Sequence, residues 1–543
     1  MVDEQVPVLV VGGGSVGLAC AAFLGSHGIR SLVVERRAGL SDHPRATAIG
    51  PRAWEALLSL GLRDELLAIA ERRSRTRGVL HARTVAEADV AAAAAKAEHA
   101  TTFVDPIKEF SPAANIGGLG QNQLDPLLSR AATESGARIR WNTEVVSLES
   151  GGTEAKASLR GVTTGERSTV TAEYVIAADG DASPTRAALG FPISGPRALG
   201  GDRINVVFRA DLSALLPGEG FIMVNVSHPE ASGMLHSMDG SKDLWSYHID
   251  VPGGTDDIAA RYPPERCVEV IRTAFGSPDH DIEILSALPW RPTGRLAGQF
   301  RRGRVLLAGD AAHTMPPTGS FGLTTGIGDA QNLAWKLAMV LRGQAGRSLL
   351  DTYDAERRPR ARFCRDQAML RLHNPAVHWN ANDAEGRAKA GIAHHAVAHL
   401  SDRCESTAVV DSPSKPLSFE DIAANLDGSP GTRVPHIWVE RRGERVSTLD
   451  LAGPDFVLLA GPKGHPWLGA GRAAAEALGI AVATYLVGDD LADPDGRWEA
   501  AAGIDADGTL LVRPDHIIGW RARALPQGPE RALTAALRQI LSR

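Results

Sequence analysis

Gly309 and Asp310 open a segment, residues 309–326, whose residue types suit the binding of a polyol joined to an electron-rich ring. A carboxylate accepts hydrogen bonds from hydroxyl groups, and glycines let a ligand approach the backbone closely. The segment leads into an expected amphipathic helix that ends near Leu337, and a helix start offers unpaired N–H groups and positive potential. Its further glycines are Gly319, Gly322 and Gly326.

The start of the chain carries a dinucleotide-binding fingerprint, which consists of a strand, a glycine turn, a helix and an acid. An apolar strand over Val8 to Val11 leads into a GxGxxG turn, and a helix follows to about His27. A second apolar strand, Ser31 to Val34, ends at Glu35, where an acid binds a ribose hydroxyl. GxGxxG alone is also typical of a plain glycine-rich turn, but the strand, helix and acid around it predict nucleotide binding. The turn residues are Gly12, Gly14, Ser15, Val16 and Gly17.

A third segment lies between these two. An apolar strand is expected over Tyr174 to Ala178, and Asp179 and Gly180 follow it directly. On their own, Asp and Gly in sequence indicate a turn. Their position after a buried strand, between two other ligand-binding motifs, favours a part in the same site.

The three motifs, in this order and spacing, resemble those of the class A flavin-dependent aromatic monooxygenases, the para-hydroxybenzoate hydroxylase type, over roughly the first 380 residues. The end of the chain resembles the thioredoxin-like C-terminal domain of the larger hydroxylases, which include phenol hydroxylase-like enzymes and aromatic polyketide hydroxylases. That second resemblance rests on Arg433 to His436, Ser447 to Leu451, Leu511 to Asp515, and Trp520 with Arg521.

The resemblance implies an α/β fold: a Rossmann-like FAD-binding domain, an inserted mixed β-sheet substrate domain, and a C-terminal thioredoxin-like α/β domain. Residues 1–185 are expected to form the first part of the FAD-binding domain, and residues 186–300 the substrate domain. Residues 301–400 return to the FAD-binding domain and add connecting helices. Residues 417–543 form the last domain, which has no redox cysteines because none follows Cys404.

The inserted domain shows strand patterns with a period of two. Trp245 and Tyr247 share one face of a predicted strand, and Ser246 and His248 share the other. Asp239 and Gly240 indicate a hairpin turn before it. The predicted strands are Ile204 to Ala210, Phe221 to Val226, Gly233 to Met238 and Leu244 to Val251.

Composition excludes several other classes of protein. The chain has 543 residues, is 43% hydrophobic and 22% charged, and carries a net charge of −6, which argues against a nucleic-acid surface. We expect no membrane contact, because no apolar run approaches the length of a spanning helix. The four cysteines are scattered and the N-terminus is acidic, so a cytoplasmic location is expected. The histidines show no metal-binding spacing, so no metal site is expected.

FAD is the cofactor that the resemblance implies, and its adenosine half would contact residues from the first half of the chain. The fingerprint glycines would bring a helix N-terminus to the pyrophosphate, and Glu35 would bind the ribose. Arg36 would lie near the adenosine, Val145 would border adenine through its backbone, and Arg45 and Gln121 match residues that face the cofactor.

The flavin half would contact residues from the second half. Asp310 would bind the ribityl hydroxyls, with Gly309 and Asp179 in the two neighbouring turns. Backbone amides of Gly322, Leu323 and Thr324 would point at the pyrimidine edge, where reduced flavin is anionic. The carbonyl of Pro317 would line the reacting face.

The implied reaction is hydroxylation of a phenolic, polycyclic aromatic compound of the polyketide type. NAD(P)H would reduce the flavin without a domain of its own, and O2 would then give a flavin C4a-hydroperoxide that attacks the ring. The protein would exclude water and assist phenol deprotonation, for which Tyr247 and His236 are candidates alongside Pro317. For either side chain taken singly, packing or solvent exposure is the favoured interpretation, and His313 is expected to be structural.

Alternatives remain open at this point. The same scaffold could perform Baeyer–Villiger insertion or oxidative rearrangement. A flavoprotein that binds and sequesters an aromatic intermediate without hydroxylating it is a different class of function. Ser320 and Thr324 keep that class open, because many relatives have Gly and Asn there. The substrate, the choice of NADH or NADPH, and a monomeric or homodimeric state are not determined by the sequence.

Overall fold

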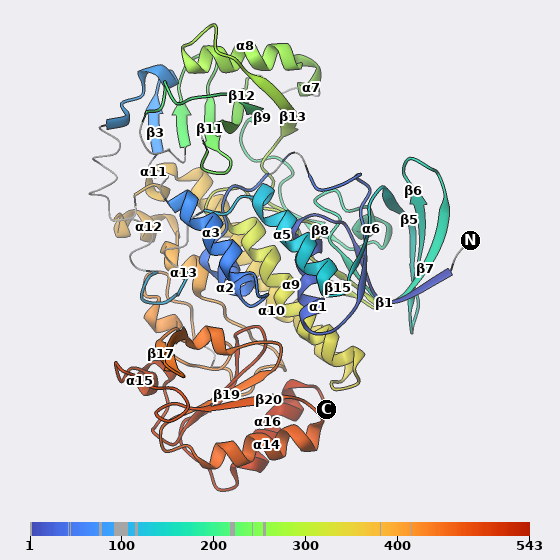
Figure 1. The fold of residues 1–543 in the computed structure, drawn as a ribbon, viewed down its shortest axis with the longest axis vertical. Helices are drawn as coiled ribbons and strands as arrows, with labels where there is room; N and C mark the ends of the chain where they lie inside the picture. Colours follow the sequence, from blue (N-terminus) through green and yellow to red (C-terminus); the bar gives the residue numbers. More distant parts are fainter. Residues whose placement is uncertain are drawn as a thin grey trace.

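The computed structural model describes residues 3–41, 43, 45–74, 79–91, 107–113, 118–217, 223–241, 243–252, 257–380, 382–413 and 415–543. Figure 1 shows three regions along the long axis of the molecule. A nucleotide-binding region lies in the middle, a second sheet with its helices covers one end, and the C-terminal domain covers the other. This is the mixed α/β fold that the sequence predicts.

The central region is built on an eight-stranded sheet with the order β15-β16-β7-β1-β2-β4, to which β6 and β5 are added beside β7. β1 runs parallel to both β2 and β7, and β16 runs parallel to β7. Val8 to Val11 are almost fully buried, which is typical of a parallel sheet covered by helices on both faces. The strands are β1 (Asp3–Val11), β2 (Ser31–Val34), β4 (Arg138–Arg140), β5 (Thr143–Ser150), β6 (Ala155–Gly161), β7 (Arg167–Ala177), β15 (Arg301–Arg302) and β16 (Val305–Leu307).

Helices from both halves of the chain cover this sheet. A helix was expected from Ser348 to Arg357. In the structure a 3-10 turn occupies Arg347–Leu350, and helix α10 follows it and continues to His373, well beyond the predicted end. The described helices in this part of the chain, whether or not they contact the sheet, are α1 (Ser15–Ser26), α2 (Pro51–Leu58), α3 (Arg63–Ser74), α5 (Gln121–Glu134), α6 (Pro184–Ala188), α9 (Phe321–Leu341), α10 (Asp351–His373), α11 (Pro375–His378), α12 (Ala384–Ala390) and α13 (His395–Leu400).

The second sheet has six strands in the order β13-β9-β12-β11-β10-β3. Strand β3 comes from the segment that the sequence assigned to the FAD-binding domain, and it pairs in parallel with β10. Phe221, where one strand was predicted to begin, lies outside the described residues. The elements are β3 (Val79–Ala82), β9 (Asp202–Arg209), β10 (Met223–Val226), β11 (Gly233–Ser237), β12 (Leu244–Val251), β13 (Glu283–Trp290), α7 (Ile258–Arg261) and α8 (Pro264–Phe275). A separate small ladder pairs β8 (Ile193–Ser194) with β14 (Leu296–Ala297).

The C-terminal domain has a four-stranded sheet with the order β20-β19-β21-β22. β19 is parallel to β20 and antiparallel to β21, and helices α14 and α16 pack together beside the sheet. This β-α-β, β-β-α arrangement is the thioredoxin-like one that the sequence predicts. The elements are β17 (Trp438–Arg441), β18 (Glu444–Ser447), β19 (Phe456–Ala460), α14 (Pro466–Leu478), β20 (Val482–Leu486), α15 (Trp498–Ala502), β21 (Thr509–Val512), β22 (Ile518–Ala522) and α16 (Pro529–Ile540).

Two structural features are absent from the described residues. Within them, no helix combines the length and apolar character needed to cross a membrane. In the same ranges, no group of three or more His, Cys, Asp or Glu side chains is arranged to hold a metal ion. All four cysteines are free thiols and buried.

Candidate functional site

The three glycines of the first turn serve different purposes. Gly12 has φ +106°, and a Cβ there would overlap the backbone of Ala178, while a Cβ on Gly17 would overlap the carbonyl oxygen of Gly12. Protein packing therefore requires both. A Cβ on Gly14 would meet only one side-chain atom of Arg37, at 4.0 Å. Gly14 thus leaves backbone accessible to a ligand, and it is the N-cap of α1, which has no side-chain cap.

The free N–H groups at the start of α1 and the open backbone at Gly14 suit a pyrophosphate, which a helix N-terminus stabilises. Behind this turn, Ser15 Oγ donates to Asp125 Oδ1 on α5 at 2.5 Å. Burial raises the pKa of Asp125 to about 6, against the effect of the Ser15 hydrogen bond.

Glu35 is positioned by hydrogen bonds at the end of β2. Its Oε2 accepts from Gly13 N at 2.7 Å, and its Oε1 accepts from the backbone and side chain of Arg37 at 3.0 and 2.9 Å. Burial opposes ionisation of Glu35, but these hydrogen bonds outweigh it and lower the pKa. Glu35 is therefore an anion at the edge of the glycine turn, where the sequence predicts the ribose. Arg36 is exposed beside it.

The loop that carries Arg45 is fixed to α5. Gln121 Oε1 accepts from Arg45 N at 2.9 Å and from Ala46 N at 3.4 Å, so Gln121 orders this loop through its amide. The Arg45 side chain is exposed, and its charge partly offsets the effect of burial on the pKa of Asp310. Arg45 and Asp310 therefore lie close enough to interact. Val145, on β5, is half-buried and packs against the edge of the central core.

Gly309 and Asp310 form a turn that faces the start of α1. Gly309 has φ +59°, and a Cβ on it or on Gly326 would collide with Val16. The Val16 side chain therefore occupies the space that these glycines leave and packs the two glycine turns against each other. The Asp310 side chain is exposed and makes no hydrogen bond to a described residue, yet surrounding protein raises its pKa. Both carboxylate oxygens are available to ligand hydroxyls.

His313 braces this turn from behind. Its Nε2 lies 2.7 Å from Asp329 Oδ2, and the same oxygen accepts from Gly309 N at 3.2 Å. Arg357 Nε donates to Asp329 Oδ1 at 2.9 Å. His313 and Asp329 are fully buried, so His313 is structural, as the sequence analysis expected. Asp329 was not predicted to matter and holds three elements in place.

The start of α9 lies at the other side of the site. Ser320, its N-cap, has φ +57° and gives no side-chain cap. Thr324 Oγ1 donates to Ser320 O at 2.7 Å and accepts from Gly50 N at 2.8 Å. The threonine that replaces the common Asn thus ties α9 to the start of α2. Gly322 is open, since a Cβ there would meet nothing closer than Met315 at 3.8 Å, and Leu323 beside it is half-buried.

Two groups that were predicted to contact the cofactor, the Pro317 carbonyl and Asp179, accept hydrogen bonds from protein groups in this structure. The Pro317 ring is exposed, and its carbonyl accepts from Ser320 N at 3.0 Å. Asp179 accepts from Ser183 Oγ at 2.5 Å and from Thr185 N at 3.0 Å, so both of its oxygens cap α6. Their contacts with a cofactor stay predictions.

Tyr247 and His236 lie on opposite faces of the second sheet. Tyr247 is 1% exposed in the core under α8, and its hydroxyl donates to the carbonyl of Ala231. Burial raises the pKa of Tyr247 above its usual range. His236 is on the other face, with its ring edge-on to His248 at 5.4 Å between centroids. The structure does not bring the two candidates together, and a catalytic role for Tyr247 stays a prediction that this geometry does not support.

The face with His236 is turned toward the nucleotide-binding region. His43, in the loop before α2, lies with Nδ1 2.6 Å from Ser286 Oγ on β13, which joins that loop to this face. His248 lies edge-on to Trp290 at 5.5 Å, and its Nδ1 has no hydrogen-bond partner among the described residues. Burial, His236 and nearby arginine charge lower the pKa of His248 well below its usual range, so its imidazole is neutral.

The C-terminal domain is held to α9 and α10 by buried charges. Glu356 accepts from Arg513 Nη1 at 2.7 Å and from Lys336 Nζ at 2.8 Å, and Asn332 Nδ2 donates to both Glu356 and Asp515. Burial opposes ionisation of Glu356, but the charges of Arg513 and Lys336 outweigh it and keep its pKa well below the usual range. These contacts fix the direction of α9, whose first turn faces the site.

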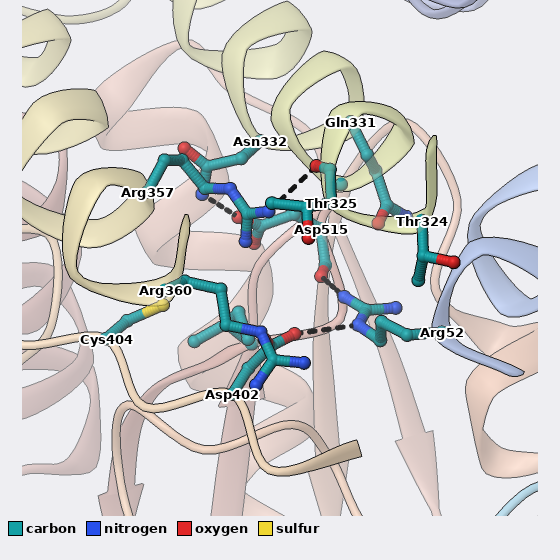
Figure 2. Close-up of a pocket in the computed structure, with 12 residues that line it drawn as sticks. Arg52, Thr324, Thr325, Gln331, Asn332, Arg357, Arg360, Asp402, Cys404 and Asp515 are labelled. Atoms are coloured by element: carbon teal, nitrogen blue, oxygen red, sulfur yellow. Dashed lines mark hydrogen bonds and ion pairs between the residues drawn. The ribbon is translucent and has the colours of Figure 1, made fainter. Parts of the chain in front are cut away.

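A cavity of about 20 Å³ lies beside this network. Figure 2 shows the residues that line it, which come from α2, α9, α10, the segment with Asp402 and Cys404, and the C-terminal domain. Arg52 Nε donates to Asp402 at 2.9 Å and Arg360 Nε lies 3.0 Å from the other oxygen of that carboxylate. Burial opposes ionisation of Asp402, but these two arginines lower its pKa to about 2. A space of this size admits about one water molecule. The charges around it are paired, so the cavity belongs to domain packing.

Sequence reasoning missed Asp125 and His248. Asp125 lies four residues after Gln121 and so shares its helix face, which was a signal available in the sequence. His248 was placed on the correct polar face by period two. Nothing in the sequence distinguished it from His236, because the contact of this face with the loop at His43 is a tertiary feature.

The donor set fits a dinucleotide with a polyol. The glycine turns are surrounded by two helix starts without side-chain caps, an ionised acid at β2, and the Asp310 carboxylate, which makes no hydrogen bond to a described residue. Gly14 and Gly322 are open where a ligand backbone contact is expected.

Comparisons with known proteins agree with this assignment. Residues 5–368 match the family described as "FAD binding domain", and residues 427–543 match "Aromatic-ring hydroxylase, C-terminal". The chain is 38% identical to tetracenomycin A2 monooxygenase-dioxygenase of Streptomyces glaucescens and 37% identical to 4-methyl-5-nitrocatechol 5-monooxygenase of a Burkholderia species. In both cases 100% of this chain and 98% of the relative are covered. A crystal structure of aklavinone-11 hydroxylase with FAD and aklavinone is similar over 100% of both chains, with a TM-score of 0.85 and 33% identity.

Proposed function

Because the chain belongs to the FAD-dependent aromatic-ring monooxygenases, we propose that it uses NAD(P)H and O2 to hydroxylate a phenolic, polycyclic aromatic compound. FAD, O2 and a reductant follow from membership of the family. The identity of the reductant, the polycyclic nature of the substrate and the hydroxylation outcome are the parts proposed here. The single observation that carries the proposal is the exposed Asp310 carboxylate, which makes no hydrogen bond to a described residue, together with the uncapped start of α9.

FAD, when bound, would supply the redox chemistry: electrons from the reductant and O2 would be combined there, one oxygen atom entering the aromatic ring and the other leaving as water. The protein's part begins with binding. The N–H groups at the start of α1 hold the pyrophosphate and Glu35 holds the ribose. Asp310 accepts hydrogen bonds from the ribityl chain. The form in which oxygen is held before transfer stays a prediction.

The start of α9 supplies the electrostatic part. The N–H groups of Gly322 and Leu323 have no intrahelical acceptors, because they belong to the first turn after the N-cap Ser320. Together with the helix dipole they favour negative charge on the pyrimidine edge, and hence reduction of the flavin. Thr324 holds this turn against α2, and the exposed Pro317 lies in the turn before it.

The proposed substrate surface is the face of the second sheet that carries His236, His248 and Trp290. The Trp290 ring and the neutral imidazole of His248 suit a flat ring system with phenolic hydroxyls, which they contact by stacking and hydrogen bonding. The names of two relatives support a polycyclic ligand, since one acts on tetracenomycin A2 and another is bound to aklavinone. A relative named for 4-methyl-5-nitrocatechol makes a single-ring phenol the alternative within the same proposal.

The test is flavin reduction and reoxidation with a panel of ligands. The FAD-loaded protein is reduced anaerobically with NADPH or NADH, then mixed with oxygenated buffer, with hydroxylated anthraquinones, nitrocatechols or no ligand present. We expect one ligand class to accelerate reduction and to be converted to a product with one added oxygen atom. NMR of that product distinguishes ring hydroxylation from ring insertion or rearrangement.

Direct reoxidation with no product, whichever ligand is present, contradicts the proposal and favours a protein that sequesters its ligand. Asp310→Ala is expected to lose FAD while the fold is retained, because its carboxylate makes no hydrogen bond to a described residue. Asp495→Asn, an exposed change in the C-terminal domain, is the matched control. The cytoplasmic location and the monomeric or homodimeric state stay predictions.

A further inference from the structure

One row of side chains crosses the face of the second sheet that is turned toward the nucleotide-binding region. In the sheet register, Asn205 on β9 lies between Leu288 on β13 and His248 on β12, and Met234 on β11 follows His248. Directly opposed residues of antiparallel strands have Cβ atoms about 4.5–5.5 Å apart. This Asn205 row therefore places two polar side chains next to each other, between a leucine and a methionine.

The Asn205 amide is oriented by the protein, but only its oxygen has a partner. Asn205 is 3% exposed, and its Oδ1 accepts from Ser246 Oγ on β12 at 2.6 Å. Its Nδ2 donates no hydrogen bond to a described residue and is not enclosed by the surrounding atoms. A polar group that folding removes from water carries a cost until it finds a partner. Asn205 Nδ2 is therefore available to an oxygen of a ligand.

His248, the neighbour of Asn205 across the strands, provides a second open nitrogen. Its Nδ1 is enclosed without a partner among the described residues, whereas its Nε2 makes no hydrogen bond to them and is not enclosed. Burial and His236 hold the pKa of His248 well below its usual range, so the ring is neutral and forms one hydrogen bond at Nε2. His43 contributes to the same shift, so the row lies near the loop that carries Arg45.

The apolar side chains on either side of this polar pair are accessible. Leu288 is 42% exposed and Met234 is half-buried, so the row is open at both ends. Trp290, two residues after Leu288 on the same face, holds its ring edge-on to His248 at 5.5 Å between centroids. A flat aromatic ligand can therefore lie against apolar surface while one of its edges meets two nitrogen groups.

We propose that the Asn205 row binds the edge of the aromatic substrate through two oxygens on neighbouring positions. Asn205 Nδ2 donates to one oxygen, and His248 Nε2 forms a hydrogen bond with the other. Two oxygens that adjacent nitrogens reach together must themselves be close, as in a catechol or in a hydroxyl beside a quinone carbonyl. A ligand without such a pair leaves one nitrogen unpaired and loses affinity. The inference rests on the proposed function and deepens it, because it names the oxygen pattern of the substrate.

Ser246 is the positioning residue of this row. Its side chain is buried, with 1% exposed, and its hydroxyl fixes the oxygen end of the Asn205 amide. Ser246→Ala removes that hydrogen bond, so the amide can rotate and direct Nδ2 away from the ligand. The preference for paired oxygens should then fall only in part, because His248 still contacts one of them.

Matched ligands test the oxygen pattern without any change to the protein. The FAD-loaded, full-length protein is titrated with 1-hydroxyanthraquinone and 2-hydroxyanthraquinone, which differ only in whether the hydroxyl lies beside a carbonyl. Catechol and resorcinol, with oxygens on adjacent and on separated carbons, form the single-ring pair. Binding is followed by the change in flavin absorbance. We expect the paired-oxygen isomer to bind about fivefold more tightly or better in at least one pair, and that pair identifies the ring class.

Variants then assign the preference to Asn205. Asn205→Leu keeps the size of the side chain and should abolish the preference while binding of the other isomer is retained. The double variant Asn205→Leu with Ser246→Ala removes both partners of the buried hydrogen bond, which costs little stability, and should behave in the same way. Asn225→Leu is the matched control, because Asn225 lies in the same row of the sheet on β10, beyond Met234, and its Nδ2 contacts His81. It should keep the preference.

Turnover gives a second readout that a loss of folding does not mimic. Asn205→Leu should raise the KM for the paired-oxygen substrate and leave the KM for NAD(P)H unchanged. Equal binding within both ligand pairs, or no binding of any of the four ligands, overturns the proposal. A preference that survives in Asn205→Leu or in the double variant overturns the part given to Asn205. None of these outcomes decides the monooxygenase proposal, which depends on product formation.

Discussion

Replacing Asp125 with Asn should stabilise the folded protein relative to wild type, and by more at pH 8 than at pH 4. The carboxyl group is 4% exposed, and burial raises its pKa from 3.8 to about 6. A raised pKa in the folded state means that folding favours the protonated carboxyl group. Protonated Asp125 therefore contributes to stability fully when the pH is below the unfolded-state pKa of about 3.8, and this contribution is lost as the pH rises through the folded-state pKa of about 6.

The magnitude follows from the shift. A change of about 2.2 pKa units corresponds to about 3 kcal/mol at pH 8 and about 0.5 kcal/mol at pH 4. Asparagine keeps an oxygen that accepts from Ser15 Oγ but does not ionise, so the variant lacks this loss. The stability difference between Asp125→Asn and wild type should therefore grow by about 2.5 kcal/mol over this range.

Thermal unfolding of the FAD-free, full-length protein measures the effect. The midpoint of the variant should exceed that of wild type by on the order of 2 °C more at pH 8 than at pH 4, for a chain of 543 residues. Asp495→Asn, at an exposed site, should show no such trend. A difference in midpoint that stays constant with pH, or that falls as the pH rises, would refute the reasoning about Asp125.

Three further variants separate ligand contacts from protein packing. Gly14→Ala should fold normally, because a Cβ there has room within the protein. Its methyl group should contact the pyrophosphate and weaken FAD binding by about tenfold or more, which titration with FAD followed by fluorescence measures. Gly17→Ala should instead lower the unfolding midpoint of the FAD-free protein, since its Cβ overlaps the Gly12 carbonyl, and a variant as stable as wild type would contradict this close packing of the turn. Glu356→Gln leaves the cations of Arg513 and Lys336 without their shared anion and should destabilise the protein by about 3–5 kcal/mol, measured by urea unfolding; an unchanged urea midpoint would show that this pairing is not needed.

Local patterns predicted much of the fold. The buried strand at Val8 to Val11 and the one at Ser31 to Val34 are confirmed, because apolar runs between turn signals have few other structures available. The strand order of the C-terminal domain also agrees with the family resemblance. Strand β3 could not be predicted, because its parallel pairing with β10 depends on contacts more than a hundred residues apart.

The sequence predicts candidate site residues best where the backbone conformation demands a particular residue type. The turn glycines and Asp310 were selected in this way, from their spacing relative to buried strands. In the second sheet, period two placed Tyr247 and His248 on opposite faces, but the pattern does not reveal which face is covered by α8. Asn205 was not singled out either, because an amide whose oxygen alone has a partner is recognised only in three dimensions.

The central claim is that one atom of O2 enters an aromatic ring at this site, and labelled oxygen tests it most directly. Turnover of the aromatic compound that best accelerates flavin reduction is run under ¹⁸O2 with NADPH, and the product is analysed by mass spectrometry. We predict a product that carries one ¹⁸O atom on a ring carbon. NADPH consumption that yields only hydrogen peroxide, or a product whose added oxygen comes from water, would contradict the account.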